Sequence, residues 1–298
     1  MSILKQYSFA SLADYIKAAE TTDKGHYDCY EQYKGSHDRT YVEKFSGVRG
    51  WPHMRELALK GWPDGLKKLV HAMARTRHTV ARRPKRRMDV AGAFPSVPLA
   101  VAGDPLYMVH RLPQDMTSAP VVRLAIQRNA MASYEVNEFE NYGAAVMSYV
   151  DALEQSGIRC ELNLLFHAEG QGKRKATYSA LVRIKNAESP MNYDHMAFCL
   201  IHAAVQRKIS IVHRLTHNPS DLPGFDNAGR TCNPDKSHLP HDMLLVPSLM
   251  VFPHNSRELA SPEASLKALT PILEKMLSAA GVTPPELHFE TAKPGPAE

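Results

Sequence analysis

The chain has few cysteines: four among 298 residues, at positions 29, 160, 199 and 232. They are scattered along the chain, so they do not predict a disulfide framework. Reduced thiols in a cytoplasm are the simpler interpretation. No apolar run approaches the ~18 residues that cross a membrane, and the N-terminus lacks the basic start and apolar block of a secretory signal. We therefore expect a cytoplasmic protein without a membrane partner.

The familiar catalytic motifs are also missing. The sequence contains no Gly-x-Ser-x-Gly elbow, no His-Glu-x-x-His pair and no kinase motif set. A Gly-containing turn at 169–172, followed by three basic residues, lacks the spacing of a phosphate-binding loop. No residue is therefore predicted to be catalytic, and a protein without enzymatic activity is expected over an enzyme.

Positive charge is concentrated in one place. The formal net charge is +5, and removing the seven cations between positions 75 and 87 leaves −2, because no acid lies among them. Such a density of cations binds phosphate backbones and predicts contact with nucleic acid; a solvated helix end followed by a flexible linker is the alternative. A second basic spot is expected at a hairpin tip, at Lys173, Arg174 and Lys175. The first set, called the basic segment below, consists of Arg75, Arg77, Arg82, Arg83, Lys85, Arg86 and Arg87.

The first 88 residues are predicted to be mainly helical. Phe9, Leu12 and Ile16 recur at helical spacing, with Ser8 or Ser11 as the N-cap. Gly-Trp-Pro occurs twice, at 50–52 and 61–63, and each copy precedes a short helical pattern. We interpret the two tryptophans as anchors that dock a helical hairpin onto a core, rather than as a duplication.

The clearest pattern lies between residues 121 and 255. Apolar residues alternate along 158–168 and again along 175–185, which predicts a β-hairpin. Residues 209–215 are expected either to extend the second helix or to form a strand. The order strand, helix, strand, strand, helix, strand is that of a split β-α-β unit, so we predict an α+β fold with a ferredoxin-like core. The six segments are 121–130, 141–157, 158–168, 175–185, 194–208 and 242–252.

Four regions follow from these patterns. They are a helical N-terminal region with a basic end (1–88), a Pro-rich connector (89–120), the α+β core (121–255), and a C-terminal helix with a disordered tail (256–298). Pro271 lies inside the last helical pattern and predicts a break or kink there.

Histidine and cysteine residues form a possible metal site. His213 and His217 are four residues apart and would share one face of a helix. Zinc takes ligands of these types, although polar loop histidines are the alternative because the chain contains 15 of them. Zinc is the one cofactor considered. The candidate ligands are His213, His217, Cys232, His238 and His241.

Three stretches of sequence resemble those of uncharacterised proteins encoded by tailed phages and prophages. The first is Trp-Pro-His-Met-Arg-Glu-Leu-Ala-Leu-Lys-Gly-Trp-Pro-Asp-Gly at 51–65, where a Trp and a Gly-Trp-Pro-x-Gly bracket a short helix. The others are 89–98 and the turn at 153–158. The resemblance covers roughly residues 8 to 250. It implies phage origin and a domain of unknown function, and it implies no site residue.

Three functions remain open from the sequence. The first is a phage-encoded accessory protein that contacts nucleic acid through the basic segment and the second basic spot. The second is a virion or assembly component that binds phage or host proteins through the Trp-bearing hairpin and the last helix. The third is a metal-dependent enzyme that uses the histidine-rich stretch. The expected location is the host cytoplasm, or the virion for the second function.

Overall fold

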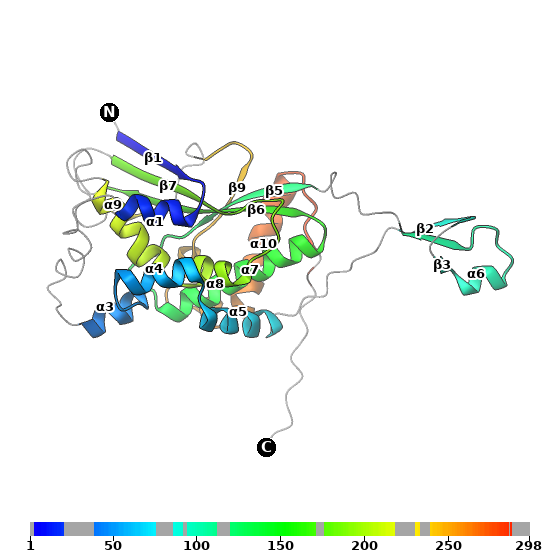
Figure 1. Ribbon diagram of the computed structural model, residues 1–298, viewed down its shortest axis with the longest axis horizontal. Helices are drawn as coiled ribbons and strands as arrows, with labels where there is room; N and C mark the ends of the chain where they lie inside the picture. The colour runs from blue at the N-terminus through cyan, green and yellow to red at the C-terminus, as the bar shows by residue number, and fades with distance from the viewer. Residues whose placement is uncertain are drawn as a thin grey trace, which may run out of the picture.

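The protein is a mixed α/β structure in which helices pack on one face of a six-stranded sheet (Figure 1). A second sheet of three short strands lies apart from this main body in Figure 1. The computed structural model describes residues 3–20, 39–75, 86–91, 94–111, 120–170, 176–217, 230–232, 239–285 and 287. Among the helices it describes, none is long and apolar enough to cross a membrane.

The main sheet has the strand order β1-β7-β6-β5-β9. Strands β5, β6 and β9 are parallel to one another, β7 runs antiparallel to β6, and β1 runs parallel to β7. A sixth strand, β8, pairs with β6 beyond the end of β5. The strands are β1 (Ile3–Phe9), β5 (Val121–Gln127), β6 (Arg159–Glu169), β7 (Ala176–Lys185), β8 (Arg230–Thr231) and β9 (Met243–Val246).

The strand order does not confirm the ferredoxin-like prediction. A split β-α-β unit needs another strand between the two strands that a helix joins. Here β5 and β6 are joined by helix α7 (Val136–Gln155), yet they are direct neighbours, and β7 lies outside them. Both arrangements have the same order of elements along the chain, so the sequence pattern did not distinguish them.

Several predicted elements are confirmed. The hairpin at 158–185 is the antiparallel pair β6 and β7, and the helix predicted at 141–157 is α7. The second predicted helix is α8 (Tyr193–Ile201), which ends at His202 in an extended conformation. Residues 209–215 are helical rather than a strand. The first two end a π-helix (Val205–Ser210), and the others belong to α9 (Ile211–Thr216), which follows it directly.

One contiguous core joins the sheet to its helices. It extends from Leu12 near the N-terminus to Leu277 near the C-terminus, well beyond the region with the clearest sequence pattern. Two buried guanidinium groups, those of Arg128 and Arg207, lie over the ring of Phe139 at 5.4 and 4.7 Å. They also donate to backbone carbonyl groups, which is how a buried arginine keeps its hydrogen bonds.

The N-terminal segment begins with a strand that the sequence analysis missed. Phe9 was assigned to the first helix, but it is the last residue of β1, which pairs with β7. The helix α1 (Leu12–Glu20) starts after Ser11, whose Oγ accepts a hydrogen bond from the N–H of Asp14 at 3.1 Å. The N-cap was therefore predicted correctly, and Ser11 rather than Ser8 provides it.

The Gly-Trp-Pro-Asp-Gly motif closes the helical hairpin formed by α4 (Trp51–Lys60) and α5 (Pro63–Arg75). Gly61 ends α4 with φ 97°, and a Cβ at Gly65 would lie 1.9 Å from the ring of Trp62. Glycine is therefore required at both positions. Both tryptophans pack against the core, as the anchor interpretation predicts. The motif accordingly has a structural role.

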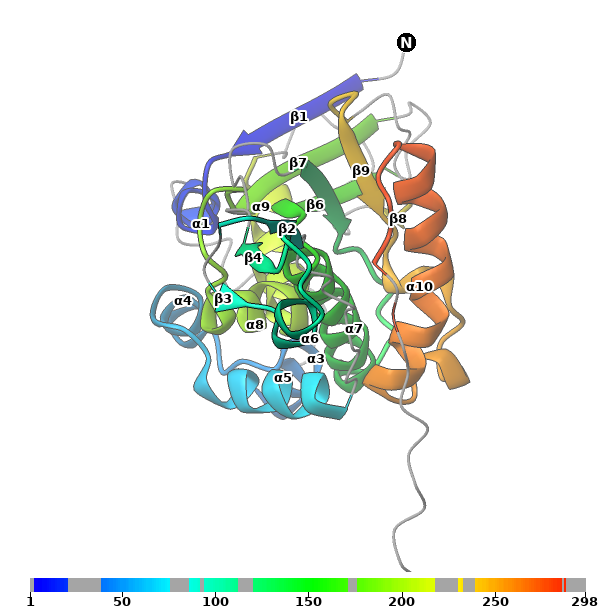
Figure 2. The same cartoon turned by 90° about the vertical axis from the view of Figure 1, so that its right-hand side faces the viewer.

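The last helix, α10 (Pro262–Ala279), is continuous through Pro271, so of the predicted break or kink the break is absent and the kink stays a prediction. Leu266, Leu269, Leu273 and Leu277 are all buried on both sides of the proline. Their packing holds the helix together although Pro271 has no N–H to donate. In Figure 2, α10 lies alongside α7, and the two helices are in contact.

The small sheet has the order β2-β4-β3. It falls across the predicted Pro-rich connector and the end of the basic segment, and a short helix α6 (Val97–Val101) joins β3 to β4. Helix α3 (Arg39–Ser46) and the 3-10 turns at Leu249–Val251 and Arg257–Leu259 complete the described elements. The three strands are β2 (Arg86–Asp89), β3 (Phe94–Pro95) and β4 (Met108–Arg111).

Lys185 ties α7 to the hairpin, and its removal should be costly. Its buried Nζ lies 2.6 Å from Glu154 Oε1 and donates to the carbonyl groups of Cys160 and Asn186 at 3.0 and 3.1 Å. We expect Lys185→Met to lower the free energy of unfolding by about 2–4 kcal/mol in urea denaturation, because it leaves a carboxylate and a buried carbonyl unsatisfied. The exposed Lys267→Met should change it by less than about 0.5 kcal/mol. Equal unfolding midpoints for the two variants would contradict this role.

Candidate functional site

Three side chains of different chemistry meet where β6 ends. His167 and Glu169 lie on β6, and Cys232 follows β8 directly. A ring nitrogen, a carboxylate oxygen and the sulfur of these residues all lie within 4.8 Å of one another. His167 is buried, Cys232 is partly buried and Glu169 is exposed. Solvent therefore reaches the cluster at Glu169.

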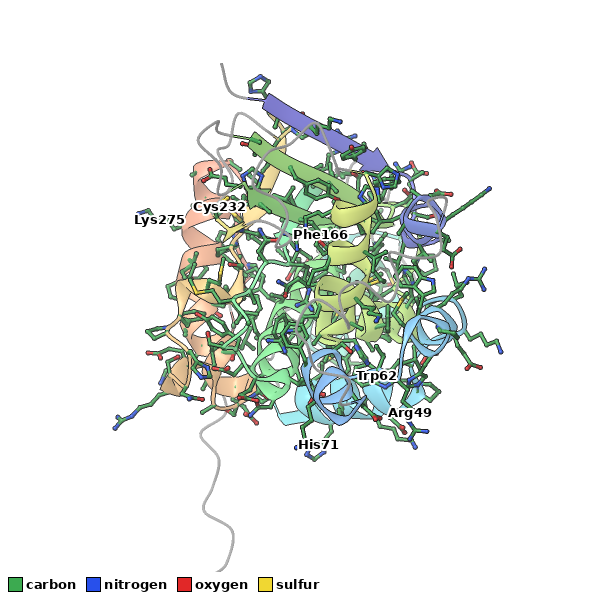
Figure 3. The ribbon with its side chains drawn as sticks, turned by 90° about the vertical axis from the view of Figure 1, so that its left-hand side faces the viewer. Arg49, Trp62, His71, Phe166, Cys232 and Lys275 are labelled. Atoms are coloured by element: carbon green, nitrogen blue, oxygen red, sulfur yellow. The ribbon has the colours of Figure 1, made fainter. Side chains whose placement is uncertain are left out.

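The pairing of β6 with β8 explains this juxtaposition. Ala168 lies opposite Thr231, and Glu169 lies opposite Arg230. Extending this antiparallel register by one residue, past Thr231, places Cys232 opposite His167. Side chains alternate along a strand. Phe166 and Ala168 point into the core on the helix side of the sheet. His167 and Glu169 therefore point to the opposite face. Figure 3 labels two of these residues, Phe166 and Cys232.

Two buried amide side chains from the end of β5 hold the backbone of this cluster. Asn129 Nδ2 donates to the carbonyl of His167, and its Oδ1 accepts from the N–H of His167 at 3.2 Å. Gln127 Nε2 donates to the carbonyl of Cys232 at 2.8 Å. Both amides are 2% exposed. The carboxyl ends of the parallel strands β5 and β6 therefore meet here, which is the edge where α/β sheets commonly bind ligands.

The histidine pair predicted to share a helix face does so, in a different place. The rings of His213 and His217 are stacked at 4.1 Å, on the helix side of the sheet. His213 is fully buried, and its Nδ1 lies 2.7 Å from the hydroxyl of Tyr178, which in turn lies 3.1 Å from the hydroxyl of Tyr15. Burial, and to a smaller degree His217 and Arg214, lower the pKa of His213 to about 3. The imidazole is therefore neutral near pH 7.

The five candidate metal ligands do not form one described cluster. Cys232 lies with His167 and Glu169, whereas His213 lies on the opposite face of the sheet, among aromatic rings. His241 is exposed, and His238 lies outside the described residues. Metal binding by the predicted set stays a prediction.

Most of the predicted nucleic-acid contacts lie outside the described residues. These are Arg77, Arg82, Arg83 and Lys85, and also Lys173, Arg174 and Lys175. Arg75 is the last residue of α5, and Arg86 and Arg87 begin β2. The basic segment therefore connects the helical hairpin to the small sheet.

The small sheet adds two basic residues that the sequence analysis missed. In the antiparallel register of β2 and β4, Arg86 pairs with Arg111 and Arg87 pairs with His110. A sequence signal was available, since His110 and Arg111 end an apolar, β-rich stretch. Their pairing partners were not apparent, because the intervening prolines suggested a connector.

A pocket of about 420 Å³ lies at the other edge of the main sheet, where β1 and β7 end. Its walls include Ser11, Arg183, Lys185 and His195. The first residues of α1 and α8 border it. Lys185 is engaged with Glu154, and burial lowers the pKa of His195.

The fold and these sites define a mixed α/β protein with a polar cluster at the carboxyl ends of two parallel strands. No membrane-spanning helix is present among the described residues. The chain belongs to the family described as Domain of unknown function (DUF7192), which matches residues 3–278. No curated protein and no solved structure matches the chain.

Proposed function

We propose that the chain contacts nucleic acid through the basic segment and the small sheet that follows it. The observation that carries this proposal is the pairing of Arg86 with Arg111 and of Arg87 with His110. Like charges directly opposite each other destabilise a strand pair. An anionic polymer that neutralises the Arg86–Arg111 pair removes this cost, so binding and formation of the small sheet support each other.

The distribution of charge supports the same proposal. The seven cations of the basic segment account for more than the whole net charge of +5. The rest of the chain is therefore slightly acidic and does not attract polyanions by itself. A localised excess of Lys and Arg is the electrostatic footprint of a nucleic-acid contact. Phage origin, action in a host cytoplasm and a contribution from Lys173 to Lys175 remain part of this proposal.

Salt dependence provides the test. Full-length protein should shift a 30-base-pair DNA duplex or a single-stranded RNA of similar length in a gel at ~50 mM salt, and the affinity should fall steeply as salt rises. Replacing Arg82, Arg83, Arg86 and Arg87 together by serine should flatten the slope of log K against log salt by about 3 to 4, because each lost phosphate contact removes about 0.9. Comparing the two probes separates DNA from RNA.

A control with the same charge change excludes a general effect. The control replaces four exposed lysines on helices α1, α4, α5 and α10 by serine, which also removes four charges. These lysines are Lys17, Lys60, Lys67 and Lys267. This variant should keep the wild-type salt slope. The proposal fails if no shift is seen at ~50 mM salt, or if both variants lose affinity equally.

A second candidate function, an assembly component, is favoured by exposed apolar residues. Five large hydrophobic residues between positions 90 and 107, in and around the small sheet, are exposed. Exposed apolar patches mark surfaces that bind other proteins. This candidate predicts that the protein is present in purified virus particles. The residues are Val90, Val97, Val101, Leu106 and Tyr107.

A further inference from the structure

A nitrogen, an oxygen and a sulfur donor converge at the end of β6, and this combination is typical of a metal site. Imidazole, carboxylate and thiolate are the three side-chain ligand types of zinc. A cluster of carboxylates alone would suit many solvated surfaces, whereas His167 and Cys232 add two borderline-soft donors.

The separations suit a zinc ion after a small movement. Zinc–ligand bonds of about 2.0–2.3 Å place tetrahedral ligand atoms about 3.3–3.8 Å apart. The donors of His167, Glu169 and Cys232 lie within 4.8 Å of one another. Closing the difference requires shifts of at most about 1.0–1.5 Å, which rotations about side-chain torsions can provide, most easily for the exposed Glu169.

The backbone beneath the cluster is already held in place. Asn129 bonds both backbone groups of His167, and Gln127 bonds the carbonyl of Cys232. Buried groups that fix the ligand-bearing backbone are typical of metal sites and raise their affinity. The two ligands that are farthest apart in sequence are thus positioned by Gln127, the last residue of β5, and by Asn129, which follows it.

We propose that His167, Glu169 and Cys232 bind one zinc ion and leave its fourth position open to solvent. This site is independent of the proposed contact with nucleic acid. It shares Cys232 with the ligand set predicted from the sequence and replaces His213 and His217, which lie on the other face of the sheet. Three protein ligands and one open position are the arrangement of zinc sites that bind water or an exogenous ligand.

Metal content and cobalt spectroscopy test the proposal on the full chain. Protein dialysed against zinc and then against metal-free buffer should retain about one zinc per chain. Cobalt(II) loading should give a near-ultraviolet thiolate-to-cobalt band, since cobalt reports sulfur ligation directly. Cys232→Ser should abolish this band and weaken zinc binding by more than the ~10–100-fold that a second-shell change costs. His167→Asn should weaken zinc binding similarly, and Glu169→Gln should weaken it less.

Two control variants make the result specific. Cys29→Ser removes a different thiol, and His241→Gln removes an exposed histidine of the predicted set; both should keep the cobalt band and the zinc stoichiometry. Circular dichroism of each variant verifies that it is folded. The proposal is overturned if wild-type protein holds well under one zinc per chain and shows no thiolate band. It is also overturned if Cys232→Ser keeps the band, or if His241→Gln loses zinc while His167→Asn retains it.

Discussion

Replacing Gly143 by alanine is expected to destabilise the protein by about 3 kcal/mol or more, because the added methyl group overpacks a contact between two helices. Gly143 lies on α7 where that helix meets α8. A Cβ there would lie 1.9 Å from the carbonyl oxygen of Leu200 and 2.7 Å from its carbonyl carbon. Both atoms belong to the backbone of α8, so the two helices would have to separate.

The direction of this effect is diagnostic. In an exposed helix, glycine to alanine stabilises by about 1 kcal/mol through helix propensity. A loss at Gly143 therefore measures the close approach of the two helices. Gly281→Ala is the matched control, because Gly281 has φ 74° and no atom within 4 Å of its Cβ position; it should cost about 1 kcal/mol from backbone strain alone. Urea denaturation compares the two, and an unchanged midpoint for Gly143→Ala would contradict the packing.

Acid is expected to weaken the fold strongly between pH 7 and pH 5. Burial is the main cause that lowers the pKa of both His202 and His213 to about 3, against an unfolded value of about 6.5. The unfolded state therefore takes up the proton first. The stability contributed by the neutral imidazoles is complete above pH 6.5 and is lost as the pH falls toward 3. From pH 7 to 5 the loss is about 2 kcal/mol for each histidine.

The surroundings of the two histidines strengthen this expectation. His202 packs against Trp62 and Phe198, and the neighbouring groups that act on its pKa, those of His53, Arg128 and Lys68, all oppose a positive imidazole. His213 lies among aromatic rings beside His217 and Arg214. No acidic group contributes to either shift, so neither protonated ring gains an ion pair.

His202→Asn tests this pH dependence without a change of fold. The Asn Oδ1 can accept the hydrogen bond that His202 Nδ1 accepts from the N–H of Ala204 at 3.0 Å. The loss of unfolding free energy between pH 7 and 5 should fall from about 4 to about 2 kcal/mol. His241→Asn, at an exposed position, should keep the wild-type loss. Identical pH profiles for wild type and His202→Asn would show that His202 is not buried neutral.

The sequence predicted elements whose signal is local. The alternation along β6 and β7 and the apolar periodicity of α7 each appear within one segment, and all three elements are confirmed. Strand order is different, because it depends on which side of β6 receives β7. The polar pattern of β1 also gave no clear signal, since an edge strand buries little and its partner β7 lies far along the chain.

The candidate zinc site illustrates the same limit. His167 and Glu169 are two residues apart on a strand, a spacing that places them on one face. Cys232 reaches them only because two residues of β8 pair with β6 beyond the end of β5. So short a strand has no hydrophobic pattern of its own. The sequence therefore supplied Cys232 as a candidate ligand but grouped it with His213 and His217, whereas the structure places it beside His167 and Glu169.

The parallel pairing of β1 with β7 limits when the main sheet can be completed during synthesis of the chain. Ile3 lies opposite Ala176 in the register, so the first strand waits for roughly 170 further residues to be synthesised, about 10–35 s at ordinary rates of synthesis. Similarly, β9 joins β5 only after the intervening helices are made. Contacts of such long range slow folding. The main sheet therefore stays incomplete for most of the synthesis of the chain. During this interval its unpaired strand edges are exposed, and we expect chaperones to bind the nascent chain then.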